Sequence, residues 1–198
     1  MHKYCFFDFD NTLVPKDSMG RLIPFCLKKH PWTFIYLFPI IPYGILYGLK
    51  LIDFIPLKQK ILFPLAILRE EELKEFYETC LIPNYFTNVV EELKKKKEEG
   101  YIIYLVSASP EMYLKYTDLP VDQIIGTKAG IENGKVKIYG KNCKSAQKVV
   151  RIQEYIDLSD IDYENSYGYS DSSSDLPMLK LCKHMIHILK KDGTMTTF

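Results

Sequence analysis

The sequence predicts an α/β protein, in which a parallel sheet is flanked by helices and carries an inserted α-helical cap. Apolar runs at residues 4–7 and 101–106 read as buried strands, and residues 166–169 form a weaker third run. Helical patterns separate these runs, as expected for an open α/β sheet. The stretch 15–98 has helical patterning and little strand signal, which is typical of a lid inserted beside a functional site.

Composition and charge exclude several classes of protein. The 198 residues are 47% hydrophobic, enough for a buried core, and 26% charged, which argues against global disorder. The net charge of +1 offers no electrostatic basis for binding nucleic acid. Five widely spaced cysteines without a C-x-x-C pair predict neither a disulfide framework nor a zinc site. Because the N-terminus also lacks the pattern of a signal peptide, we expect a cytoplasmic protein.

Two carboxylates directly follow the first predicted strand, in the segment Asp8-Phe-Asp10-Asn-Thr12-Leu. If the chain turns there, both can reach one site. Phosphoryl transfer needs a nucleophile, a proton donor for the leaving oxygen and a cation that offsets phosphate charge. One aspartate could attack while the other protonates the leaving alcohol and later deprotonates water. A turn or a helix N-cap is the alternative, and it is the commoner meaning of an isolated pair.

The insertion after this segment divides the chain into two predicted domains. Residues 1–14 and 99–198 form the catalytic core, and residues 15–98 form the helical cap. Within the cap, residues 71–99 are rich in Glu, Lys and Leu and read as helix, with a break at Pro83-Asn84.

One part of the cap, Pro31 to Leu49, contains no charged residue. Its length is borderline for a membrane span, and Pro39 and Pro42 break the helix in the middle. Three interpretations follow. Ordinary packing inside the cap is the leading one, contact with a membrane surface or an acyl chain is the second, and a true span is the least favoured. Lysines flank the segment, as snorkelling cations would; these are Lys28, Lys29 and Lys50.

Polar residues also follow the second predicted strand, in Ser107-Ala108-Ser109-Pro110. A hydroxyl and free amides at the start of a helix can cradle a phosphate, and the same residues can serve as a simple N-cap. Further along, Asn133-Gly134 between apolar flanks predicts a β-hairpin.

Two later segments supply charge of both signs. Lys144 and Lys148 lie where another helix opens, and a lysine there could neutralise a phosphate and the attacking carboxylate. Asp171 and Asp175 follow the third predicted strand, and hard oxygen ligands at a strand end suit Mg²⁺. The alternatives are a surface lysine and an acidic, serine-rich loop. Because the three polar clusters at Asp8 and Asp10, at Ser107 and at Asp171 follow strands, we expect them to meet at the carboxyl edge of the sheet.

The four segments, in this order, resemble the four motifs of the haloacid dehalogenase superfamily, and they span nearly the whole chain. The resemblance implies a Rossmann-like core and a covalent aspartyl-phosphate intermediate. Asp8 resembles the nucleophile and Asp10 the general acid and base. Thr12 resembles the threonine that steadies the loop. Phosphate would be bound by Ser107, the adjoining amide of Ala108 and Lys148; the Cys-x-x-x-x-Lys spacing favours this lysine over Lys144.

The same resemblance implies Mg²⁺ as cofactor. Asp8, the main-chain carbonyl of Asp10 and Asp171 would hold the ion, and Asp175 would support them. Two positions depart from the pattern: Ser170 stands where relatives often have glycine, and Ser174 where some phosphoserine phosphatases have asparagine. Neither departure removes a carboxylate.

The helical insertion is similar to the cap of the phosphoserine-phosphatase-like branch. Asp17-Ser-Met-Gly20, Lys28-Lys29-His30 and the segment from Gly168 to Cys182 resemble the membrane-linked phosphatidylglycerophosphatase group. A lipid phosphate is therefore one expected substrate, and a small soluble phosphate ester is the other. Asp17 could contact the substrate or simply cap a helix that begins at Ser18.

Two further functions use the same residues. A phosphotransferase would pass the phosphoryl group to an acceptor other than water, and nothing in the sequence separates it from a hydrolase. A non-catalytic binding module is disfavoured, because a retired site would tend to lose carboxylates that are intact here.

Overall fold

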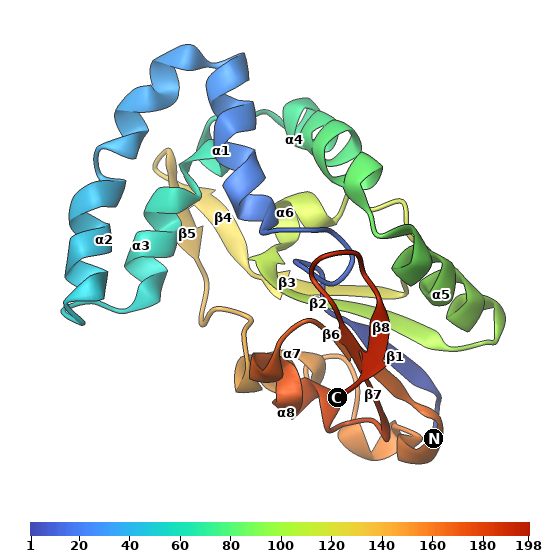
Figure 1. Cartoon of the computed structure of the whole chain (residues 1–198). Coiled ribbons are helices and arrows are strands. Elements are labelled where there is room, and N and C mark those ends of the chain that lie inside the picture. The colour runs from blue at the N-terminus through green and yellow to red at the C-terminus, as the bar shows by residue number, and fades with distance from the viewer.

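The computed structural model describes residues 1–198 and contains a six-stranded sheet in the order β3-β2-β1-β6-β7-β8 (Figure 1). All neighbouring strands are parallel except β7 and β8. The predicted α/β class is thereby confirmed. The strands are β1 (Tyr4–Phe7), β2 (Ile102–Pro110), β3 (Gln123–Thr127), β6 (Tyr167–Ser170), β7 (His184–Ile188) and β8 (Met195–Thr197).

The central strand β1 is buried on both faces, which explains its continuous apolar sequence. Cys5 and Phe7 belong to the larger core cluster, together with residues of α5 (Thr87–Glu98) and α6 (Glu111–Leu114). Tyr4 and Phe6 face the opposite side, where α7 (Ala146–Ile152) and α8 (Leu176–Leu179) pack. Helices therefore cover both faces of the sheet.

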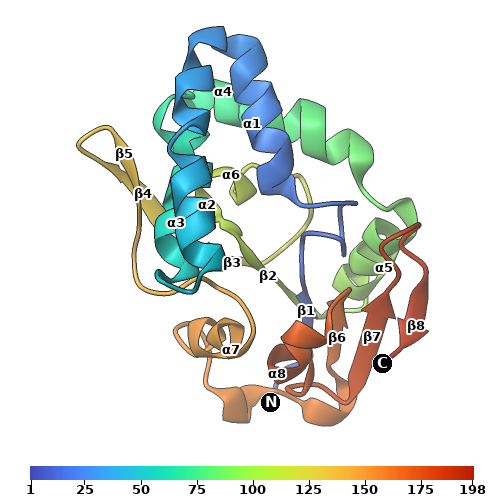
Figure 2. The ribbon, with the colours of Figure 1, turned by 60° about the vertical axis from the view of Figure 1, so that its left-hand side comes forward.

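The cap helices lie over the carboxyl edge of the strands (Figure 2). They are α1 (Ser18–Lys29), α2 (Ile40–Gly48), α3 (Phe54–Ile61) and α4 (Glu70–Phe76), with 3-10 turns at Pro31–Leu37, Phe63–Ala66 and Ile82–Asn84 and a π-helical turn at Tyr77–Leu81. Helix α5, which falls within residues 15–98, packs on the sheet face rather than with these helices. The expected break at Pro83-Asn84 is confirmed, because it separates α4 from α5.

The predicted hairpin is confirmed as β4 (Ala129–Glu132) and β5 (Lys135–Ile138). Asn133 and Gly134 form its turn with φ angles of 50° and 69°, a conformation that these two residue types tolerate best. Strand β5 packs on α3, and the Ile138 amide donates to Gln59 Oε1 at 2.9 Å. A segment far along the chain therefore supports the cap.

The uncharged segment from Pro31 to Leu49 does not pack as cap core, contrary to the leading interpretation. Helix α2 has no buried residue, and Thr33 is the one buried residue of the preceding 3-10 turn. The break at Pro39 is confirmed, since this residue is the N-cap of α2, whereas Pro42 lies within the helix. None of the helices has both the length and the apolar character needed to cross a bilayer.

Gly126 of β3 leaves room for the end of β2 and the start of α6. A Cβ there would lie 2.6 Å from the Ser109 carbonyl oxygen and 2.9 Å from the Glu111 amide nitrogen. Because both are backbone atoms, Gly126→Ala should lower the free energy of unfolding by about 1–3 kcal/mol in urea denaturation. Gly20→Ala, in open space within α1, is the control and should be neutral or stabilising by up to about 1 kcal/mol. Wild-type stability of Gly126→Ala would contradict this packing.

Candidate active site

The first strand delivers Asp8 to the carboxyl edge of the sheet. The Asp8 amide continues the strand ladder by donating to the Tyr169 carbonyl at 3.0 Å, and the chain then turns. The amides of Thr12, Leu13 and Val14 all converge on the Phe9 carbonyl, and Asn11 adopts a positive φ of 59°. This turn brings the side chains of Asp8 and Asp10 to one cavity of about 270 Å³.

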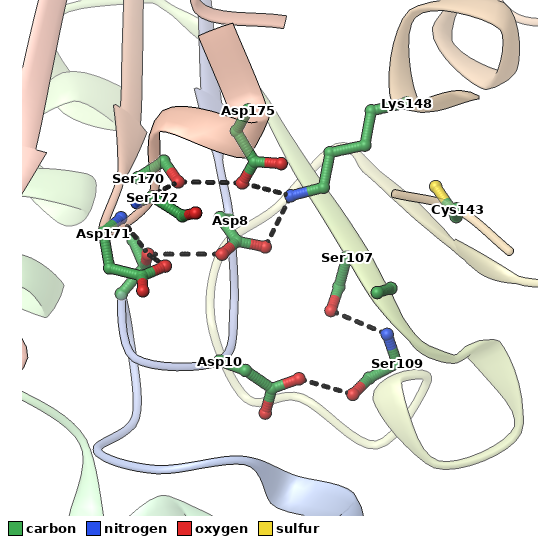
Figure 3. A network of polar contacts seen from close by, with 12 residues as sticks. Asp8, Asp10, Ser107, Ser109, Cys143, Lys148, Ser170, Asp171, Ser172 and Asp175 are labelled. Carbon is green, nitrogen blue, oxygen red and sulfur yellow. Dashed lines mark hydrogen bonds and ion pairs between the residues drawn. The ribbon is translucent and has the colours of Figure 1, made fainter. Parts of the chain in front are cut away.

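A buried lysine joins two of the predicted carboxylates (Figure 3). Lys148 Nζ on α7 lies 2.6 Å from Asp8 Oδ1 and 2.8 Å from Asp175 Oδ2, and all three residues are less than 10% exposed. Ser170 Oγ also donates to Asp175 Oδ2 at 2.8 Å. The expected choice of Lys148 over Lys144 agrees with these contacts, because Lys144 lines the cavity without an ion pair to Asp8.

Burial and ion pairing oppose each other in this group. Burial raises the pKa of Asp8 to about 7, against the effect of the Lys148 ammonium. Burial also works against the charge on Lys148, but the two carboxylates outweigh it and raise the pKa of Lys148 above its ordinary value. The lysine therefore stays protonated, and it favours the ionised form of Asp8.

Thr12 lies beneath the cavity and links two carboxylates. Its hydroxyl is 3.4 Å from Asp8 Oδ2 and 3.5 Å from Asp171 Oδ1, and it accepts from the Asp171 amide at 3.1 Å. On the solvent side, the exposed Lys190 places its Nζ 3.0 Å from Asp171 Oδ2. A cationic group thus already occupies a position beside this carboxylate.

Asp10 is held by both the cap and the core. The Ser18 amide, at the start of α1, donates to Asp10 Oδ1 at 2.7 Å, and Ser109 Oγ donates to Asp10 Oδ2 at 2.5 Å. Burial, with a smaller effect of the negative charge on Asp17, raises the pKa of Asp10 to about 6. Asp10 therefore retains a proton more readily than an exposed aspartate, as a group that donates protons requires.

The C-terminal end of β2 forms another wall of the cavity. Ser107 Oγ accepts from the Ser109 amide at 3.0 Å, and the Ala108 carbonyl accepts from Lys58 Nζ of α3 and from Thr127 Oγ1, both at 2.6 Å. Lys58 is fully buried and also donates to Asn142 Oδ1 at 2.6 Å. Burial lowers the pKa of Lys58 to about 8. The position of Lys58 in the cavity wall and the contact of Ser109 with Asp10 were not predicted from the sequence.

Most of the predicted residues meet in this cavity. Asp17 caps α1, because its Oδ1 accepts from the Met19 amide at 2.8 Å, and it also lines the cavity. The expected capping role is confirmed, and contact with substrate stays a prediction. The predicted residues that line the cavity are Asp8, Asp10, Asp17, Ser107, Ala108, Lys148, Asp171 and Asp175; Thr12 is buried below them.

The donor set fits a hard cation. The structure contains no group of three His, Cys, Asp or Glu side chains arranged to hold a metal. Mg²⁺, however, usually takes one or two carboxylates and completes its shell with water and phosphate oxygens. Asp8 and Asp171 converge on the Thr12 hydroxyl and would be the two carboxylates available to such an ion.

Removing the lysine should destabilise the protein in a pH-dependent way. In Lys148→Met, Asp8 and Asp175 are left buried without their cation, so the folded-state pKa of Asp8 should rise further above its unfolded value of about 3.9. A raised folded-state pKa costs stability as pH increases. We expect a loss of about 3–5 kcal/mol near pH 8 and a smaller loss near pH 5, measured by urea unfolding in EDTA.

The control for this variant removes one of the stranded charges. Lys148→Met combined with Asp175→Asn should recover part of the stability lost near pH 8, because one buried carboxylate becomes neutral. An equal loss at both pH values would contradict the role of uncompensated charge.

Known proteins resemble this chain in both sequence and structure. Residues 5–180 match the family described as haloacid dehalogenase-like hydrolase. A Bordetella pertussis Tohama I protein of unknown function is similar in structure, with a TM-score of 0.77 and 21% identity over 95% of this chain and 90% of that one. A substrate-bound phosphoserine phosphatase gives a TM-score of 0.65 and 17% identity, covering 95% and 86% of the two chains.

A phosphoserine phosphohydrolase-like protein from Francisella tularensis gives a TM-score of 0.61 and 21% identity over 94% of this chain and 87% of that one. No match was found among curated protein sequences. At these identities the structural neighbours show a shared fold, whereas the family match covers most of the chain. The chain therefore belongs to the haloacid dehalogenase-like hydrolase family.

Proposed function

We propose that this protein is a Mg²⁺-dependent phosphomonoesterase that works through a phosphoenzyme on Asp8. The observation that carries the proposal is the position of Asp8, buried at the wall of a polar cavity and 2.6 Å from the Lys148 ammonium. An ion-paired carboxylate that faces a cavity and a proton donor is arranged for nucleophilic attack rather than for structure alone.

The reaction needs two half-reactions, and this chain has residues suited to both. Asp8 attacks phosphorus, the bond to the leaving oxygen breaks, and Asp10 gives its proton to the departing alkoxide. Asp10 then takes a proton from the water that attacks the Asp8 acyl phosphate, which releases inorganic phosphate and restores the Asp8 carboxylate and the protonated form of Asp10. The Ser109 and Ser18 contacts hold Asp10 in place through both steps.

The phosphate charge must be offset throughout. Lys148, the Ser107 hydroxyl and the Ala108 amide, all from residues that line the cavity, would bind the phosphate oxygens. Asp8, the Asp10 carbonyl and Asp171 would hold Mg²⁺, which when bound polarises the phosphoryl group and orients it for in-line attack. Asp175 would support these residues indirectly, because its ion pair holds the Lys148 ammonium in place.

A lipid-borne phosphate is the substrate class that we favour over a small soluble ester. The support is an aromatic contact at the cavity wall: Phe54 lines the cavity, and its ring packs on Tyr47 of the uncharged segment with centroids 5.4 Å apart. An apolar surface therefore begins where the polar site ends. A small metabolite would instead depend on polar groups within the cavity, such as Asp17 at the start of α1.

The first test is phosphate release with Mg²⁺ from phosphatidylglycerophosphate in micelles, phosphoserine, sugar phosphates, nucleotides and an aryl phosphate. Asp8→Asn should abolish release from every substrate, because an amide is a poor nucleophile. Retained activity in that variant would contradict the mechanism. Preference for the lipid would support the favoured substrate, and preference for a soluble ester would support the alternative. Transfer to added alcohols in place of phosphate release would indicate a phosphotransferase.

Lys190 should compete with the metal for Asp171. In Lys190→Ala, Asp171 loses an ammonium 3.0 Å away, so Mg²⁺ should bind more tightly, by up to about fivefold for an exposed ion pair. Isothermal titration calorimetry of Mg²⁺ measures this without turnover. Lys191→Ala removes the neighbouring charge without removing that contact and should have a smaller effect. Unchanged or weaker Mg²⁺ binding in Lys190→Ala would argue against Asp171 as a ligand.

A further inference from the structure

The cap carries an exposed apolar surface that the catalytic site does not use. Ten of the 19 exposed large hydrophobic residues of the chain fall between residues 32 and 51, rather than being scattered singly. We call these residues the apolar face; they are Trp32, Phe34, Ile35, Tyr36, Phe38, Ile41, Ile45, Tyr47, Leu49 and Leu51. Phe38, Ile41 and Leu49 are each more than 60% exposed.

Helix α2 is the centre of this surface and has an unusual environment. It contains no charged residue and no buried residue, although an all-apolar helix is normally enclosed by protein or lipid. Figure 1 shows α2 at the outer edge of the cap, with α3 between it and β5. Its inner side packs on α3, and the rest of its surface faces outward.

Charges around the apolar face are mainly positive. Lys28 and Lys50 are exposed at its two ends and make no ion pair, and Lys60 lies 5.0 Å from the ring centroid of Tyr43. Lys29 is already paired with Glu75, and Asp53 is the exposed acidic residue next to Lys50. Basic residues that flank an apolar surface with Trp and Tyr are typical of contact with anionic lipid.

The length of helix α2 indicates whether this segment could cross a membrane or only lie on its surface. Helix α2 has nine residues and is about 14 Å long at 1.5 Å per residue, which is less than half the hydrocarbon thickness of a bilayer. The 3-10 turn before it has seven residues and is joined to the cap by stacking of Tyr36 on Phe63. The segment is therefore suited to shallow insertion beside the headgroups.

We propose that the apolar face docks the protein on the surface of an anionic phospholipid bilayer. Trp32, Phe38 and Ile41 would enter the boundary of the acyl chains, and the flanking lysines would contact the headgroups. The contact between Tyr47 and Phe54 then places the cavity beside the membrane surface. The importance of this placement rests on the proposed function, since it would bring a lipid-borne phosphate close to the cavity. Docking itself does not depend on catalysis.

Trp32 is the only tryptophan in the chain and gives a direct optical probe of docking. Vesicles of phosphatidylcholine with about one third phosphatidylglycerol should shift its emission to the blue, and bromine on the acyl chains should quench it. Flotation with the same vesicles should carry the protein upward, and pure phosphatidylcholine should carry much less. Unchanged emission together with no flotation would overturn the proposal.

Two matched variants separate the apolar face from exposed apolar residues in general. Phe38→Ser, Ile41→Ser and Ile45→Ser together should abolish flotation, whereas Ile131→Ser, Tyr155→Ser and Tyr163→Ser together should leave it intact. Aryl phosphate turnover should be unchanged in both, which separates docking from catalysis. Lys28→Gln with Lys50→Asn should weaken binding to the anionic vesicles by about fivefold per lysine; Asn suits the positive φ of 58° at position 50.

The competing occupant of the apolar face is a second copy of the chain. Sedimentation analysis over a range of concentrations would detect such a dimer. A dimer that the Phe38, Ile41 and Ile45 substitutions dissociate, with no vesicle binding by the wild type, would overturn the proposal. A wild-type protein that floats with anionic vesicles and loses this property in the same variant would support it.

Discussion

The Lys148 ammonium, buried between two carboxylates, is the interaction on which the site depends. It joins the end of β1, through Asp8, to the turn after β6, through Asp175, while standing on a helix from a third part of the chain. Each of these charges would be costly to bury alone, so the burial of each depends on the presence of the others. The result is a carboxylate, Asp8, that is held in one position and whose ionised form is favoured by the neighbouring ammonium, against the effect of burial.

A second set of contacts joins the cap to the residues that line the cavity. Ser18 of α1 donates to Asp10, and Lys58 of α3 donates to the Ala108 carbonyl at the end of β2. The orientation of Asp10 and of the end of β2 therefore depends on the position of the cap. This coupling gives the cap a role in organising the site, in addition to covering it.

The apolar segment of the cap shows a different constraint. Its composition is compatible with either burial or exposure, and the expectation of ordinary core packing was wrong. Proline at the N-cap of α2 ends the preceding turn, and the short helix then lies against α3 along one side only. Whether an apolar helix is covered depends on how many neighbours the fold supplies, and this cap supplies too few.

The sequence by itself determined the parts of the protein that depend on neighbouring residues in the chain. A continuous apolar run predicted β1, and the carboxylates directly after it indicated Asp8 and Asp10 as site residues. Asn133-Gly134 predicted the hairpin turn. Strands β3, β7 and β8 were not predicted, because their short sequences lack the continuous apolar run that marks β1. Lys58, Ser109 and Lys190 join the site only through contacts with distant residues. Sequence spacing carries no information about such pairs, so only the tertiary structure could decide them.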